Sequence, residues 1–309
     1  MAKVAGDHDE VMTTELVAVV VAMLGNVPHI LTAPEAAGAP RLPSGPLQSR
    51  HPTMQAGLRS WVEQQTGYNL KYVEQLYTFA DPARTKAGGR IISVSYLGLT
   101  RVGAGQGNWV PWYELFPWED RRSSTALVDK QIAPALSKWV QGATELAHRQ
   151  SQRQRCDADF GLGDYPWISA LNLQRYELLY EAGLVTESED DVRVPDVQLG
   201  RAMAFDHRRI VATGIARLRA KSQYRPVVFE LMPREFTLGQ LQAVVEALTG
   251  QRAHKQNFRR LIAQQNLVEE TGTTSRATGG RPARMYRFRR EVLLERHIAG
   301  TRLPVTKSR

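Results

Sequence analysis

Residues 237–268 read TLGQLQAVVEALTGQRAHKQNFRRLIAQQNLV, and the apolar residues of the first half recur at helical spacing. Thr237 followed by Gln240 has the form of a capping box, and Gly250 is suited to end a helix. We therefore predict an amphipathic helix between Thr237 and Gly250. Its buried face consists of Leu238, Leu241, Val244, Val245 and Leu248.

A second helix is predicted after the short turn 251–253, with an apolar face that includes Phe258 and Ile262. Its other faces are polar and basic. Arginine can bind guanine and asparagine or glutamine can bind adenine through paired hydrogen bonds, whereas lysine and arginine also hold phosphates. This composition is typical of a recognition helix. We expect base contacts from Gln256, Asn257 and Arg260, and phosphate contacts from Lys255 and Arg259.

A basic hairpin is predicted after this helix. A short strand at 267–270 and an alternating strand at 284–289 flank a loop rich in glycine and threonine. Six arginines and no acidic residue lie between Arg276 and Arg290. Helix, turn, helix and basic hairpin together indicate a winged helix-turn-helix, in which Arg276 and Arg281 would reach the DNA backbone or the minor groove. The alternative for the hairpin alone is an ordinary surface loop.

The charge of the chain is concentrated in the same region. Residues 222–309 contain 16 Lys and Arg against 7 Asp and Glu, so they account for the whole net charge of +9. A basic surplus confined to one part of a chain favours a polyanionic partner. We expect that partner to be double-stranded DNA.

Length and composition exclude several classes of protein. A chain of 309 residues can form two domains with substantial cores. The single cysteine, Cys156, rules out an internal disulfide bond and fits a cytoplasmic protein. The longest apolar run, Leu16–Leu24, is too short to cross a membrane, so we expect no membrane segment. The histidines show no zinc-binding spacing, and we predict no metal site.

The N-terminal half predicts an α+β fold. A strand at 16–24 would pair with 28–32, and a helix at 53–66 would follow, with Met54, Leu58, Trp61 and Val62 on one side. Two further strands are predicted at 71–79 and 90–99. Beyond an aromatic segment at 109–119, apolar spacing predicts one long helix from Ala126 to Leu146 and another at 171–182.

The segments 42–45, 54–67 and 73–79 resemble a Nudix domain whose Nudix box has lost its acids. Counted from Gly45, the positions of the box are occupied by His51, Arg59, Ser60, Glu63 and Gln64. Counted back from Gly67, the three later acids become Trp61, Gln64 and Gln65. Mg²⁺ normally needs carboxylates beside substrate phosphates, so this box is a poor hydrolase site, and we predict a domain that binds a nucleotide without cleaving it.

Three further segments, 73–80, 204–221 and 224–289, complete a resemblance to the Nudix-related transcriptional regulators of NAD metabolism, in particular the NadQ-type NAD regulators. The resemblance implies a Nudix-like α/β/α sandwich with ligand-sensing and dimerisation roles at residues 1–221, a helical insertion at about 120–198, and a winged helix-turn-helix at 222–309. It also implies a homodimeric repressor of NAD-biosynthesis genes, controlled by an effector such as NAD, ADP-ribose or ATP. The alternative is a Nudix hydrolase of ADP-ribose or a related dinucleotide.

Four arginines flank the expected nucleotide pocket and could bind a diphosphate in a bidentate manner. They are Arg41, Arg59, Arg90 and Arg101. No catalytic residue is predicted.

Overall fold

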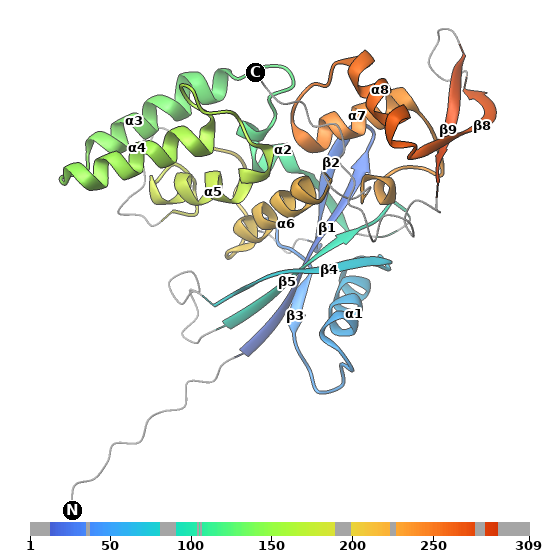
Figure 1. Ribbon diagram of the computed structural model, residues 1–309. Helices are drawn as coiled ribbons and strands as arrows, with labels where there is room; N and C mark the ends of the chain where they lie inside the picture. The colour runs from blue at the N-terminus through green and yellow to red at the C-terminus, as the bar shows by residue number, and fades with distance from the viewer. Residues whose placement is uncertain are drawn as a thin grey trace, which may run out of the picture.

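A computed structural model describes residues 13–34, 38–80, 91–103, 105, 107–188, 199–222, 227–275 and 282–289. Figure 1 shows a central sheet with a helical insertion on one side of it and a smaller domain of helices and a hairpin on the other. Within the described ranges, no helix is long and apolar enough to cross a membrane.

The central sheet has the strand order β4-β5-β1-β2-β6, and β3 also pairs with β1. Its core is β1, which runs parallel to β5 and antiparallel to β2. Alternate residues of β1 enter different apolar clusters, with Val17 and Val19 on one face and Leu16 and Ala18 on the other. A strand buried on both faces requires a continuous apolar run, as predicted. The strands are β1 (Thr13–Leu24), β2 (Val27–Thr32), β3 (Ser44–Pro46), β4 (Tyr72–Phe79), β5 (Ile91–Leu99) and β6 (Asn108–Pro111).

Helices cover both faces of this sheet, which makes it an α/β/α sandwich. On one face lies α1 (Met54–Thr66), capped by the Thr53 hydroxyl and ended by Gly67 in the left-handed conformation. On the other face lies α6 (His207–Ser222), where Gly214 allows a close approach to Val19. Leu58 and Val62 are buried under α1 as predicted, but Met54, the first residue of the helix, is 41% exposed.

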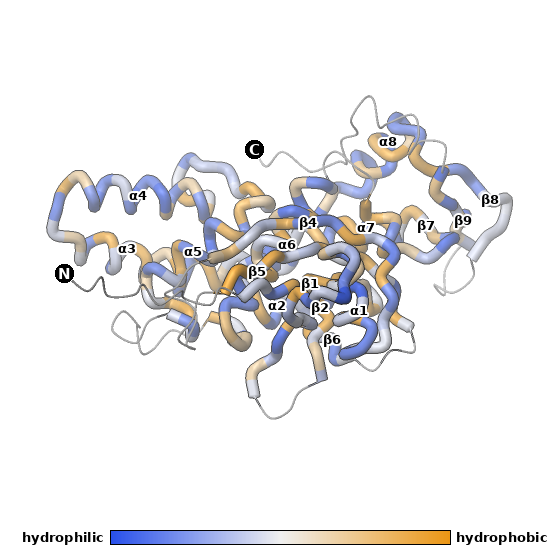
Figure 2. The backbone as a smooth tube through the Cα atoms, turned by 90° about the horizontal axis from the view of Figure 1, so that it is seen from below, coloured by the Kyte–Doolittle hydropathy of each residue, from blue (hydrophilic) through white to orange (hydrophobic). Residues whose placement is uncertain are grey.

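The insertion corrects one prediction from the sequence. The expected single helix from Ala126 to Leu146 is a π-helical turn, η3 (Val128–Ile132), continued by α3 (Ala133–Gln141). The chain then breaks at Gly142, whose low helix propensity favours a stop, and Leu146 begins α4 (Leu146–Phe160) with its side chain 67% exposed. Figure 2 shows α3 and α4 as a pair that projects from the rest of the protein.

The second predicted insertion helix is confirmed as α5 (Asn172–Glu181). Before the pair, α2 (Trp112–Leu115) and the 3-10 turn η2 (Pro117–Glu119) bury the indole rings of Trp112 and Trp118 in the apolar cluster that includes residues of the sheet.

The C-terminal part contains a three-stranded sheet of order β7-β9-β8 beside two helices. Its first strand, β7, spans only three residues and gave no periodic signal in the sequence. One apolar cluster contains both Val19 of β1 and Leu241 of α7, so the core continues past the predicted boundary between residues 221 and 222. The elements are η5 (Val227–Leu231), β7 (Glu235–Thr237), α7 (Leu238–Thr249), α8 (Lys255–Gln265), β8 (Val268–Ser275) and β9 (Ala283–Phe288).

Candidate nucleic-acid interface and effector pocket

The helix pair α7 and α8 has the local chemistry that the sequence predicts. The Thr237 hydroxyl accepts a hydrogen bond from the Gln240 backbone N–H at 3.1 Å, and the Gln240 side-chain oxygen, Oε1, accepts one from the Thr237 backbone N–H at 2.7 Å. This reciprocal capping box satisfies two amides that a helix start otherwise leaves unpaired. Gly250 ends α7 at a φ of 72°. The start and end of the first helix are therefore fixed by the sequence alone.

The outer face of α8 is exposed among the residues that the structure describes. Phe258 and Ile262 are buried beneath the helix, and the sequence-predicted phosphate and base contacts lie on its exposed side. Asn257 is half-buried, and its side-chain oxygen accepts a hydrogen bond from the Arg260 guanidinium at 2.9 Å. The helix carries no acidic residue. The exposed residues are Lys255, Gln256, Arg259 and Arg260.

The hairpin beside α8 is formed by β8 and β9. Arg284 pairs with Glu270 at 2.8 Å and Arg287 pairs with Glu269 at 2.6 Å, so acids on β8 partly neutralise these strand arginines. All four side chains are substantially exposed, and such ion pairs exchange readily for contacts to phosphate. Arg276 and Arg281, the predicted wing contacts, lie outside the described residues.

A cavity of about 400 Å³ lies where the Nudix-like sheet meets the segment that leads into the winged helix. We call it the junction pocket. Three of its side chains are cationic and one is acidic, so the pocket favours an anion. It is lined by Asn69, Lys71, Leu99, Thr100, Arg101, Glu230 and Arg234.

One of the four arginines predicted for a ligand lines this pocket, and a second contacts the backbone of a lining residue. Arg101 lines it directly. Arg59 donates from Nη2 to the Lys71 carbonyl oxygen at 3.1 Å, and its Nη1 is buried without a hydrogen-bond partner within the described ranges. Arg41 lies instead beside His207, at the start of α6. The opposite end of α6 is the one near the pocket, where Lys221 contacts Tyr72. Arg90 falls outside the described residues.

No sequence pattern predicted the remaining cations of the junction pocket. Lys71 precedes β4 and Arg234 precedes β7, and neither stands in a motif. Their proximity arises only because the chain returns to the sheet after α6. No local pattern could have paired them.

The side chains at the former metal positions hold the backbone of the domain together. Gln65 donates to the Ser44 carbonyl oxygen at 2.7 Å and accepts from the Ser44 N–H at 3.2 Å. Trp61 donates from Nε1 to the Pro46 carbonyl oxygen at 3.1 Å. These three bonds attach α1 to β3. Among the described residues, no three of His, Cys, Asp and Glu gather in a way that could hold a metal ion.

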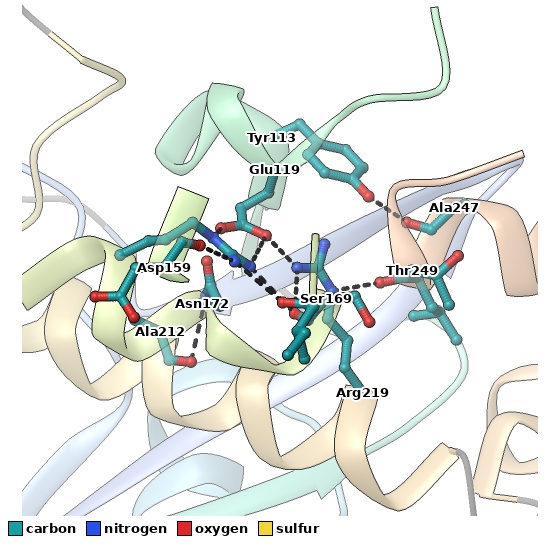
Figure 3. Close-up of polar contacts among 12 residues, drawn as sticks. Tyr113, Glu119, Asp159, Ser169, Asn172, Ala212, Arg219, Ala247 and Thr249 are labelled. Atoms are coloured by element: carbon teal, nitrogen blue, oxygen red, sulfur yellow. Dashed lines mark hydrogen bonds and ion pairs between the residues drawn. The ribbon is translucent and has the colours of Figure 1, made fainter. Parts of the chain in front are cut away.

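A buried ionic cluster joins the insertion, α6 and the winged helix (Figure 3). Glu119 accepts from Arg175 Nε at 2.6 Å and Nη2 at 3.0 Å, and also from Arg219 Nη1. Burial alone would raise the pKa of the Glu119 carboxyl, but the two guanidinium groups outweigh it, and the pKa lies below its usual value. The carboxylate therefore stays ionised in the interior and neutralises one of the two cations.

This cluster also holds the end of the first winged-helix helix. Arg219 donates from Nε to the Leu248 carbonyl oxygen at 2.8 Å, and Tyr113 donates its hydroxyl to the Ala247 carbonyl oxygen at 2.6 Å. The last carbonyl groups of a helix lack partners within it and carry a partial negative charge, so a cation there is stabilising. We call Glu119, Arg175 and Arg219 the coupling cluster, because it connects three parts of the fold.

These features define a class of protein: a Nudix-like sandwich with a degenerate box, joined through a shared core to a winged helix. The family comparison agrees with this architecture. Residues 228–288 match the model of the NrtR DNA-binding winged helix domain. This match confirms the winged helix in the part of the chain where the sequence predicted it.

Individual relatives point the same way. A segment of 86 residues, 28% of this chain, is 41% identical to the ADPR responsive transcriptional repressor NtrR of Acinetobacter baylyi. The match spans about a third, 34%, of that relative's length. The crystal structure of Shewanella oneidensis NrtR superposes with a TM-score of 0.55 at 18% identity, over 93% of this chain and 97% of that one.

Two further structures have the same fold. The Shewanella oneidensis NrtR complexed with a 27mer DNA gives a TM-score of 0.53 at 18% identity, over 89% of this chain and 93% of that one. A MutT/nudix family protein from Enterococcus faecalis gives 0.54 at 15% identity, over 92% and 89%. The fold expectation, Nudix-like domain followed by winged helix, is confirmed by these likenesses.

Proposed function

We propose that this protein is a DNA-binding transcriptional repressor of NAD-biosynthesis genes, controlled by an NAD-related nucleotide. The observation that carries the proposal is the match of residues 228–288 to a DNA-binding winged helix, together with an exposed face of α8 that holds three cations and no acid. Among NAD, ADP-ribose and ATP, ADP-ribose is the effector we favour, because the relative at 41% identity is named ADPR responsive.

In this proposal the protein acts as a homodimer. Two recognition helices would enter successive major grooves of a near-palindromic operator, about 34 Å apart. Gln256, Asn257 and Arg260 contact base edges, while Lys255 and Arg259 bind phosphates. The wing arginines Arg276 and Arg281 bind the backbone or the minor groove.

The effector's diphosphate binds in the junction pocket. Lys71, Arg101 and Arg234 supply the positive charge there, and Arg101 and Arg234 come from opposite sides of the boundary between the Nudix-like sheet and the winged helix. A dianionic ligand would draw these side chains together and change the position of β7, which directly precedes α7. The DNA affinity then differs between the two states, as allosteric control requires.

The proposal includes the absence of catalysis. At the former metal positions of α1, Trp61 and Gln65 are engaged with the backbone of β3, and Glu63 and Gln64 are exposed. Incubation of the full chain with ADP-ribose and Mg²⁺ should leave the nucleotide intact. Turnover at ordinary enzymatic rates would instead favour a hydrolase.

DNA binding is tested by fluorescence anisotropy with a duplex from the gene's own promoter. The variant Arg260→Ala should weaken binding to the operator by about 1–3 kcal/mol and relax discrimination at one base position. Arg153→Ala on α4, which is exposed and far from α8, serves as the matched control. An Arg260→Ala protein that binds the operator as tightly as the Arg153→Ala control would contradict the assignment of α8.

The effector site is tested separately. Addition of ADP-ribose should change the operator affinity of the wild type, and Arg101→Ala with Arg234→Ala should abolish this response while binding operator without effector as before. If the double variant responds to ADP-ribose normally, the nucleotide binds elsewhere.

A further inference from the structure

A second cavity lies within the helical insertion, far from α8 and the junction pocket. It has a volume of about 490 Å³ and is bounded by the end of α3, the loop after it, the first half of α4 and the end of α5. Much of its wall is small or apolar, including Trp139, Gly142, Ala143 and Ala182. Cavities of this size and lining accept small organic molecules.

One polar side chain in this cavity is buried without a partner. Gln152 is 7% exposed, and its Oε1 has no hydrogen-bond partner within the described ranges. Neighbouring polar groups of α4 are satisfied: Arg153 donates to Ser137 at 3.2 Å, and Arg155 pairs with Glu181 at 2.8 Å. An unpaired buried carbonyl costs on the order of 1–3 kcal/mol, so proteins rarely keep one that nothing satisfies.

The rim of the cavity adds charge. Lys138 and His148 line it and are both exposed. Trp139 is half-buried and offers a flat apolar surface beside them. The cavity therefore combines an aromatic wall, an inner hydrogen-bond acceptor and a cation at the entrance.

We propose that this insertion cavity binds a small aromatic carboxylic acid that also carries an O–H or N–H donor. The donor satisfies Gln152 Oε1, the ring packs on Trp139, and the carboxylate lies at the entrance beside Lys138. The site is separate from the proposed nucleotide effector and makes the insertion a second sensing module.

The test uses the full chain and isothermal titration calorimetry with 4-hydroxybenzoate and indole-3-carboxylate as probes, and benzoate as the probe that lacks a donor. The first two should bind saturably and benzoate more weakly. Gln152→Leu should reduce affinity for the two donor-bearing probes by about tenfold, the value of one lost hydrogen bond, and leave benzoate unchanged. Gln150→Leu, the same change at an exposed position of α4, should have no effect.

A stability measurement separates a ligand site from a packing role. Gln152→Leu removes an unsatisfied group without changing volume much, so the melting temperature of the unliganded protein should stay the same or rise. A clear fall would mean that Gln152 serves packing and would overturn the proposal. Absence of saturable binding by either probe, or equal binding by the Gln152→Leu protein, would also overturn it. Operator binding by Gln152→Leu should be unchanged, so failure here leaves the proposed repressor function standing.

Discussion

The substitution Glu119→Gln tests whether the coupling cluster stabilises the fold. Glu119 is 1% exposed and its carboxylate accepts from two guanidinium groups, those of Arg175 and Arg219. Glutamine has nearly the same size but no charge, and its NH₂ group would face one of the cations. The two arginines, both below 2% exposed, would remain buried and lose the one carboxylate that bonds to both of them.

The expected cost follows from this burial. Removing one partner of a buried ion pair lowers the free energy of unfolding by about 3–5 kcal/mol, because the remaining charge is left uncompensated. Since one carboxylate serves two guanidinium groups here, we expect the upper part of that range. For a domain of this size the melting temperature should fall by about 6–20 °C, which is a large part of an ordinary stability.

The assay is urea-induced unfolding followed by circular dichroism, with Glu181→Gln as the matched control. Glu181 also pairs with an arginine, Arg155, but each side chain is 44% exposed. Removing an exposed pair costs at most about 1 kcal/mol. If Glu119→Gln and Glu181→Gln destabilise the protein equally, the coupling cluster does not have the energetic role argued here.

Three further outcomes follow from buried or strained positions. Burial, and next the positive charge of Arg41, lower the pKa of His207 to about 4. As the pH is lowered, the unfolded chain protonates this imidazole near pH 6.5, whereas the folded chain does so only near pH 4. The free energy of unfolding therefore has its full value above pH 6.5 and falls by about 3 kcal/mol as the pH is lowered from 6.5 to 4. His207→Asn, which keeps an acceptor for the Leu42 N–H, should flatten this part of the stability–pH curve measured by urea unfolding. Gly250→Ala should destabilise the protein by more than about 1–2 kcal/mol in thermal unfolding, because a Cβ would lie 2.0 Å from the Glu119 carbonyl oxygen in addition to the left-handed strain. Gly163→Ala, at a φ of 58° with nothing within 4 Å of the added Cβ, should show the cost of the left-handed strain alone. If Gly163→Ala and Gly250→Ala destabilise the protein equally, the steric contact at Gly250 has no effect. Burial raises the pKa of Cys156 to about 11, so its thiol should resist Ellman's reagent in the native protein and react in denaturant; rapid native reaction would contradict the burial.

Local sequence patterns predicted those strands and helix ends that depend only on residues close to one another in the sequence. The apolar run 16–24 predicted a strand buried on both faces, and β1 contributes to an apolar cluster on each. Thr53 and Gly67 cap α1, and Thr237 and Gly250 cap α7, where the sequence placed the ends of these helices. Capping depends on residues within one turn, so it is visible without the fold.

The parts that could not be predicted depend on residues distant in sequence. The break after α3 is invisible to periodicity, because the apolar spacing continues to Leu146 although that side chain is 67% exposed. Strand β7 is too short for a pattern and exists because β9 pairs with it. The junction pocket and the coupling cluster bring together side chains from separate segments, and apart from Arg101 none of these side chains was predicted from the sequence.

Helix α6 explains how a change at the sheet can reach the winged helix. In its last turns, Lys221 bonds to Glu74 and to the Tyr72 hydroxyl at 2.7 Å, next to the strand that begins beside the junction pocket. Two residues earlier, Arg219 contacts the last turn of α7 at 2.8 Å. Because α6 is held at both sites by charged hydrogen bonds, we expect a displacement of β4 to be passed through α6 to α7. In the proposed repressor, this connection would shift the helices that meet DNA without unfolding them.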